Sequence, residues 1–167
     1  MKPSNMNEFV ISRTIEAPRE RVWNAWTNPE DMKKWWGPKG SAILDCKMDL
    51  RLGGTCHYRM RYNNQDMWGK LVYREIVRPE RLVFVTSFSD EKGGVTRHPL
   101  SPTWPLEMLS TLTLSESAGR TTLKIEWLPL SPTEAERKTF EAGHDSMQKG
   151  WTGTLDQLTE YIEKAEP

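Results

Sequence analysis

The sequence predicts an α+β fold in which a curved antiparallel sheet of about six or seven strands wraps around a long C-terminal helix. Two observations carry this prediction. Between residues 41 and 128, short stretches of alternating apolar and polar residues are separated by turn residues, which is typical of an antiparallel meander. From Ser131 to the C-terminus, apolar residues instead recur every three or four positions, which indicates an amphipathic helix.

The first strand is expected over residues 8–16, and two short helices should follow it. Ala17-Pro18 begins the first helix, because a proline at a helix start gives up an N–H that has no partner. Asn28-Pro29-Glu30-Asp31 begins the second, with a capping side chain and acidic residues near the positive end of the helix dipole. Gly37-Pro38 should end it, after an apolar side that includes Trp35 and Trp36.

The remaining strands are expected over residues 43–47, 55–62, 67–77, 81–89, 107–116 and 120–128. In the strand 55–62, one face carries apolar and aromatic residues and the other carries His57, Arg59 and Arg61. A one-residue bulge after Gly54 would exchange these faces, so the sequence leaves open whether His57 and Arg59 point into the interior. Residues 90–105 have no periodicity, and a loop of that length is typical of a lid or a binding segment.

The apolar stripe of the C-terminal segment predicts one helix of roughly thirty residues. A straight helix does not fill the hollow of a curved sheet, so we expect a cavity between the two. The upper part of the stripe should form its wall, and the lower part should anchor the helix. Gly143 and Gly150 lie beside the stripe and destabilise a helix, which indicates the close approach of a strand, of the second helix or of a ligand. Close backbone packing is the favoured interpretation. Gly150→Leu is therefore expected to unfold or open the domain.

The composition narrows the possible partners. The 23 Lys and Arg residues balance the 23 Asp and Glu residues, which gives no overall electrostatic attraction to nucleic acid or an anionic membrane. No apolar run reaches the roughly 18 residues of a membrane span. We expect a single domain over 1–167 with a disordered tail at 1–7, located in the cytoplasm, where two cysteines without a disulfide framework are usual. Eight tryptophans indicate a large aromatic core or an aromatic-lined cavity.

Several local strings are spread over nearly the whole chain. They are Ile15-Glu16-Ala17-Pro18, Trp26-Thr27-Asn28-Pro29-Glu30, Trp35-Trp36-Gly37-Pro38, Leu52-Gly53-Gly54, Pro79-Glu80-Arg81-Leu82-Val83-Phe84, Gly150-Trp151 and Leu155-Asp156-Gln157-Leu158. Together they resemble the helix-grip (SRPBCC) superfamily of START domains and the birch-pollen allergen. Within it, they are most similar to the branch of activators of the 90-kDa heat-shock protein ATPase and their homologues. The resemblance implies a helix-grip fold, but it implies little about activity, because lipid carriers, polyketide cyclases, stress proteins and chaperone regulators share this scaffold.

Three functions fit these observations. The favoured one is binding of a small hydrophobic or aromatic molecule in the cavity, with no catalysis. The second is a cyclase- or hydrolase-like enzyme that uses His144 as its acid or base, with Glu75 and Glu107 as the nearest acids. The third is regulation of a chaperone ATPase. The candidate ligand-binding residues are Trp36, Tyr58, Met60, Phe84, Phe88, Trp104, Trp127, Phe140, His144, Met147 and Trp151.

Other chemistry has little support in the sequence. His144, Asp145 and Ser146 are not a catalytic triad, because consecutive helical residues project about 100° apart. The five cysteine and histidine residues show no metal-ligand spacing, so we expect no metal and no cofactor. A small hydrophobic molecule is the expected partner, and a homodimer or a chaperone contact stays open. Trp104, between two prolines of the long loop, is a candidate lid residue.

Overall fold

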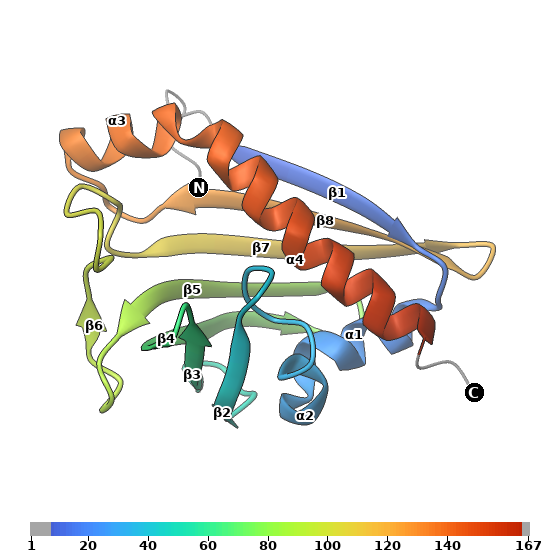
Figure 1. The fold of residues 1–167 in the computed structure, drawn as a ribbon. Helices are drawn as coiled ribbons and strands as arrows, with labels where there is room; N and C mark the ends of the chain where they lie inside the picture. The colour runs from blue at the N-terminus through green and yellow to red at the C-terminus, as the bar shows by residue number, and fades with distance from the viewer. Residues whose placement is uncertain (1–7, 165–167) are drawn as a thin grey trace.

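The computed structural model describes residues 8–164 and shows a curved, open antiparallel sheet that faces a long helix (Figure 1). The strand order is β1-β8-β7-β5-β4-β3-β2, and the short β6 pairs with β5. The α+β fold predicted from the sequence is confirmed, while the expected tail at residues 1–7 lies outside the described part of the chain. The elements are β1 (Phe9–Ile15), α1 (Arg19–Thr27), α2 (Pro29–Met32), β2 (Ala42–Met48), β3 (Thr55–Tyr62), β4 (Gln65–Val77), β5 (Arg81–Ser89), β6 (Val95–Thr96), β7 (Met108–Ser117), β8 (Arg120–Pro129), α3 (Glu134–Ala142) and α4 (His144–Lys164).

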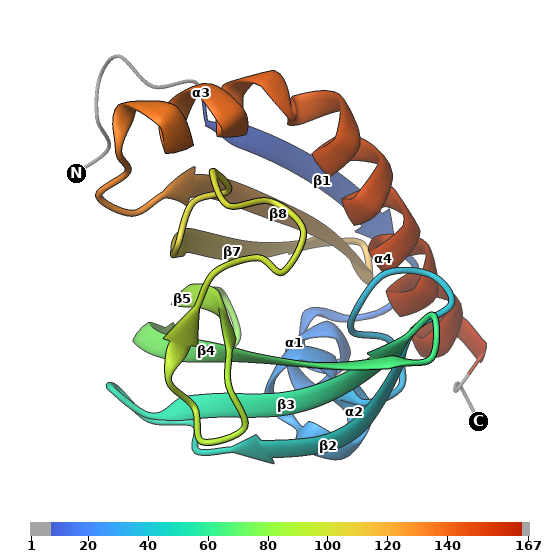
Figure 2. The same ribbon diagram turned by 60° about the vertical axis from the view of Figure 1, so that its left-hand side comes forward.

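The sheet is strongly curved and open, with β1 and β2 as its two edge strands. Helix α4 crosses its concave side (Figure 2). The predicted face alternation in β3 is correct, because the bulges lie between Ile43 and Asp45 and between Tyr73 and Glu75, not after Gly54. His57 therefore lies on the outer face. Its ring stacks on Trp68 of β4 at 4.8 Å between centroids.

The two short helices begin close to where the sequence predicts. Pro18 is the N-cap of α1 and not its first residue, a shift of one position. Asn28 caps α2 as expected, because its side-chain oxygen accepts a hydrogen bond from the backbone N–H of Glu30 at 2.9 Å. Helix α1 contributes two tryptophans to the core, Trp23 and Trp26, and both are buried.

The expected single C-terminal helix is wrong, because the chain breaks into α3 and α4 at Gly143 (Figure 1). Gly143 has φ −96° and ψ 10°, and its N–H donates to the carbonyl of Phe140 in a tightened last turn. A separate capping box stabilises the start of α3, where Thr133 and Glu136 exchange side-chain to backbone hydrogen bonds. The apolar periodicity continues across the break, so the sequence pattern does not reveal it.

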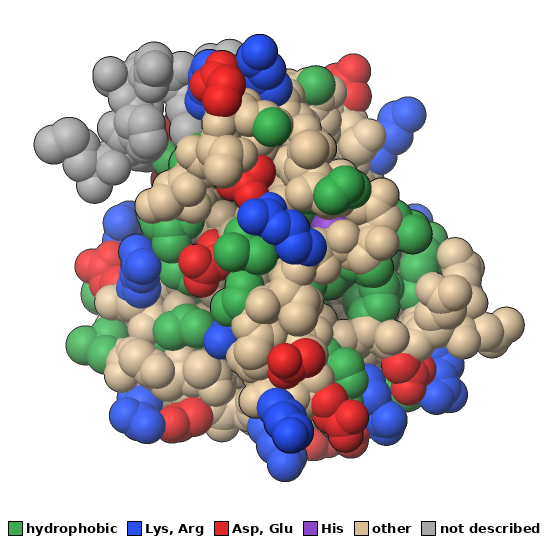
Figure 3. Space-filling view, turned by 90° about the vertical axis from the view of Figure 1, so that its left-hand side faces the viewer, with side chains coloured by type: hydrophobic (Ala, Val, Ile, Leu, Met, Phe, Trp, Pro, Cys, Tyr) green, Lys and Arg blue, Asp and Glu red, His purple; other side chains and the backbone are tan. Residues whose placement is uncertain are grey.

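Charged side chains of both signs are spread over the molecular end that Figure 3 shows, with apolar side chains between them. This agrees with the zero net charge of the sequence. None of the helices in residues 8–164 is long and apolar enough to cross a membrane.

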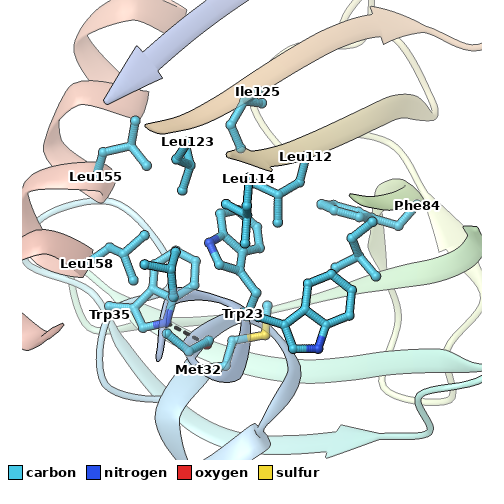
Figure 4. Packing of buried hydrophobic residues seen from close by; sticks show 14 of the residues in the cluster. Trp23, Met32, Trp35, Phe84, Leu112, Leu114, Leu123, Ile125, Leu155 and Leu158 are labelled. Atoms are coloured by element: carbon cyan, nitrogen blue, oxygen red, sulfur yellow. Dashed lines mark hydrogen bonds between the residues drawn. The ribbon is translucent and has the colours of Figure 1, made fainter. Parts of the chain in front are cut away.

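The dense part of the core lies at the other end, between α1, α2, the sheet and the C-terminal half of α4 (Figure 4). Leu155 and Leu158 of α4 pack there toward Trp23 and Trp35, and each of these four side chains is at most 1% exposed. The indole N–H of Trp35 donates to the carbonyl of Ala25 at 2.9 Å, so this aromatic side chain is buried with its polar atom satisfied. Tryptophans thus fill the hollow of the sheet at this end.

Candidate ligand-binding cavity

A cavity of about 630 Å³ lies under the first half of α4, at the end of the molecule that carries α3 and β6. Figure 3 shows the hollowed face at this end, with apolar side chains inside it. The volume is in the range of sites for small molecules. The wall consists of Trp36, Gly37, Pro38, Tyr58, Met60, Thr86, Ser87, Phe88, His98, Ser101, Trp104, Pro105, Leu106, Met108, Trp127, Thr139, Gly143, Ser146, Met147, Gly150, Trp151 and Thr154.

Four tryptophans form a continuous aromatic strip along this wall. The ring of Trp151 packs edge-on against Trp36 at 6.1 Å and against Trp127 at 5.9 Å, and Trp127 lies 6.1 Å from Trp104. These residues come from α4, the segment after α2, strand β8 and the loop before β7. The fold therefore brings together aromatic rings that are far apart in the sequence.

Tyr58 lies across β4 because that strand has a glycine at the crossing point. A Cβ atom on Gly69 would overlap the hydroxyl of Tyr58, so the phenol ring would have to move. Burial raises the pKa of Tyr58 to about 12, although a hydrogen bond from Trp36 acts in the opposite direction. The phenol therefore stays protonated at neutral pH.

The segment between β5 and β7 covers one side of the cavity. Arg97 forms an ion pair with Glu136 of α3, and the side chain of Thr139 hydrogen-bonds Thr103 at 2.9 Å. Trp104 then lies 6.4 Å from the ring of Phe140. Two polar contacts and one aromatic contact thus fix this covering segment, residues 90–107, to α3.

Comparison with known protein families assigns this chain to one of them. The family model described as Activator of Hsp90 ATPase homolog 1-like protein matches residues 16–163. The chain belongs to this family.

Solved structures support the same assignment of the fold. A protein from Nitrosomonas europaea is 24% identical with a TM-score of 0.74, and the match covers 94% of each chain. A protein from Arthrobacter aurescens is 22% identical with a TM-score of 0.76 over 98% of this chain and 90% of that one. An AHSA1-like protein from Aeromonas hydrophila is 21% identical with a TM-score of 0.66 over 95% and 94%. No curated protein sequence matches the chain significantly.

In this family member, most of the candidate residues named from the sequence line the cavity: Trp36, Tyr58, Met60, Phe88, Trp104, Trp127, Met147 and Trp151. Phe84, Phe140 and His144 do not. Phe84 is buried beside Trp26, with 6.2 Å between ring centroids, and Phe140 is completely buried. These positions correct the expectation that the whole upper stripe of the helix forms the wall.

His144 is the largest of these corrections. Its ring packs edge-on against Phe140 at 5.1 Å and Phe9 at 6.0 Å, and it does not line the cavity. Its Nε2 atom is buried without a hydrogen-bond partner among the described residues. His144 is the first residue of α4, and the break at Gly143 places it against β1.

The close packing expected at Gly150 is also wrong. A Cβ atom there would meet nothing within 4 Å, and the residue lines the cavity. At Gly143 an added Cβ would lie 3.2 Å from the carbonyl oxygen of Thr139 and 3.7 Å from the ring of Trp104. The two glycines therefore differ, since one permits a helix break and the other leaves open space.

No Asp, Glu, Lys or Arg side chain of residues 8–164 belongs to the wall. Glu75 instead pairs with Arg81, and both are partly exposed, while Glu107 lies off the wall. Within the described chain, no three Cys, His, Asp or Glu side chains converge as a metal site would require. Cys46 and Cys56 are free thiols with their sulfur atoms 3.6 Å apart.

The main residues that the sequence analysis missed are Thr86 and His98. Thr86 lies midway between Phe84 and Phe88 on β5, so strand alternation puts all three on one face and could have identified it. His98 lies in a segment without periodicity, and only the structure shows that its ring packs against Phe88 at 4.8 Å.

Proposed function

We propose that this protein binds one small hydrophobic or aromatic molecule in the cavity under α4. The main support for the proposal is the uncharged, tryptophan-rich wall. Binding is favourable in such a cavity, because an apolar ligand removes its own surface and that of the wall from water. Aromatic rings on several sides favour a flat ligand, which can make edge-to-face contacts like those between the tryptophans themselves.

The cyclase- or hydrolase-like alternative has no comparable support. It depends on His144, which packs between two phenylalanines away from the wall. Regulation of a chaperone ATPase is a role in the name of the family model, and no contact described for residues 8–164 favours it over ligand binding. We therefore favour ligand binding.

The first test is a fluorescence titration with N-phenyl-1-naphthylamine, an uncharged aromatic probe that brightens in an apolar environment. We expect saturation at one probe per chain. Gly150→Leu should abolish this signal, because its side chain enters the cavity. Gly153→Leu is the matched control, since Gly153 lies on the same helix but off the wall, with Lys39 as its nearest neighbour.

Equal probe binding by wild type and Gly150→Leu would refute the proposal. Native mass spectrometry of the purified wild-type protein provides an independent reading. A ligand retained from the cell should appear as an added mass that is absent from Gly150→Leu.

A further inference from the structure

The wall of the cavity offers hydrogen-bond donors but few free acceptors. His98 shows this most clearly. The backbone N–H of Leu100 donates to its Nδ1 atom at 3.0 Å, so Nδ1 must be unprotonated and the neutral ring carries its proton on Nε2. Burial also lowers the pKa of His98, which favours this neutral form near pH 7. The remaining ring nitrogen is therefore a donor.

Three other wall residues also carry hydrogen-bond donors. Tyr58 accepts a hydrogen bond from Trp36, and its phenol keeps its own proton. The indole N–H of Trp127 and the hydroxyl of Thr86 are buried without a partner among the described residues. An indole N–H donates only, and leaving such a group unpaired in the interior costs about 1–3 kcal/mol.

Two backbone carbonyl oxygens of wall residues already accept hydrogen bonds. The carbonyl oxygen of Gly37 accepts from the hydroxyl of Thr154 at 3.0 Å and from the side-chain amide of Gln157 at 2.7 Å. Two donors occupy both lone pairs of a carbonyl oxygen. The carbonyl of Trp104 accepts from Arg97 at 3.4 Å. The other main side-chain acceptors of the wall are serine and threonine hydroxyls, and each of these can also donate.

We propose that the ligand is an uncharged aromatic compound with a carbonyl-type acceptor oxygen, such as an aryl ketone or a quinone. This inference rests on the proposed function and names the ligand class for the same cavity. The ring system lies along the tryptophan strip, and the oxygen accepts from the wall donors after a small shift of the covering side chains. A carboxylate is disfavoured, because the described wall holds no cation to compensate for its desolvation.

The test uses compounds with one ring system and different polar groups. Binding of fluorene, 9-fluorenone and fluorene-9-carboxylate is measured by equilibrium dialysis at pH 7. We expect 9-fluorenone to bind about tenfold more tightly than fluorene, the factor that one or two net hydrogen bonds supply. Fluorene is the more hydrophobic compound, so burial alone predicts the opposite order. The carboxylate should bind more weakly than both.

Variants then identify the donors. Tyr58→Phe, His98→Phe and Trp127→Phe each keep an aromatic ring but lose a donor. At least one of them should lower the ratio of 9-fluorenone affinity to fluorene affinity. His98→Gln, which keeps a donor, serves as the conservative control at that position. The comparison among the three compounds on wild-type protein needs no variant, so a poorly folded variant does not remove the test.

The outcomes separate the two proposals. If fluorene and 9-fluorenone bind equally, or if the carboxylate binds best, the ligand class is wrong and the binding function stands. If neither neutral compound nor the naphthylamine probe binds, the proposed function itself is wrong.

Discussion

The two halves of α4 carry the same kind of apolar stripe but meet different surroundings. In the C-terminal half, Leu155, Leu158 and Ile162 are completely buried, and the tryptophans of α1 and of the segment after α2 fill the hollow of the sheet beneath them. In the N-terminal half, Trp151 is only partly buried and Gly150 faces open space. An amphipathic stripe therefore specifies which side of a helix is covered, while the elements opposite it decide whether a core or a cavity results.

The largest difference between the halves should appear when a tryptophan is truncated. Trp23→Ala removes a side chain that is 1% exposed, and we expect a loss of about 3–5 kcal/mol of unfolding free energy. Trp104→Ala, at the cavity, should cost about 1 kcal/mol, because the cavity already separates this ring from some of its neighbours. Guanidinium chloride unfolding of both variants measures the difference. Equal losses would mean that the cavity end is packed as densely as the core.

The next effect concerns the contact that fixes the covering segment to α3. Arg97→Met leaves the carboxylate of Glu136, whose side chain is 7% exposed, without its guanidinium partner. We expect a loss of about 1–3 kcal/mol, with a value near the lower limit because Arg97 itself is half exposed. The double variant Arg97→Met/Glu136→Gln should recover part of this loss. A double variant as unstable as the sum of the single changes would show that the pair does not interact.

The same pair predicts a dependence on pH. Burial raises the pKa of Glu136, but hydrogen bonds from Arg97 and Thr133 outweigh this effect and hold the pKa below its ordinary value of 4.5. A carboxyl group with a lowered pKa in the folded state contributes stability that is fully present above pH 4.5 and is lost as the pH falls through the folded pKa. Thermal unfolding between pH 6 and pH 3 should therefore show a steeper loss for wild type than for Glu136→Gln.

A smaller effect, of opposite sign, is expected at Gly150. Gly150→Ala should raise the unfolding free energy by about 0.5–1 kcal/mol, because alanine favours the helix and its Cβ atom meets no neighbour. Gly150→Leu should also keep or raise the melting temperature, because its side chain enters the open space of the cavity. A large drop in the melting temperature of Gly150→Leu would restore the interpretation that another element packs closely at this position.

The sequence predicts the packed half of the molecule better than the cavity half. Alternation places the strands to within about two residues, and the capping pattern at Asn28 identifies the start of α2. The break at Gly143 escapes detection because the apolar repeat runs through it, and the directions of Phe140 and His144 depend on that break. His98 is missed for a different reason, since a loop without periodicity carries no signal for the side that a residue faces.

The smallest change in stability and probe binding is expected for a substitution on the outer face of the sheet. It serves as the reference for the substitutions in the two halves of the molecule. His57 and Trp68 stack on each other there, away from the cavity wall. His57→Ala should change the unfolding free energy by no more than about 1 kcal/mol, the value of one exposed cross-strand pair, and should leave probe binding unchanged. Unfolding curves and the naphthylamine titration check both statements on the same sample. The register of β3 keeps the side chain of His57 out of the cavity, but its Nε2 atom lies 3.1 Å from the carbonyl oxygen of Asp90. Weaker probe binding in His57→Ala would therefore mean that this contact helps to hold the covering segment over the cavity.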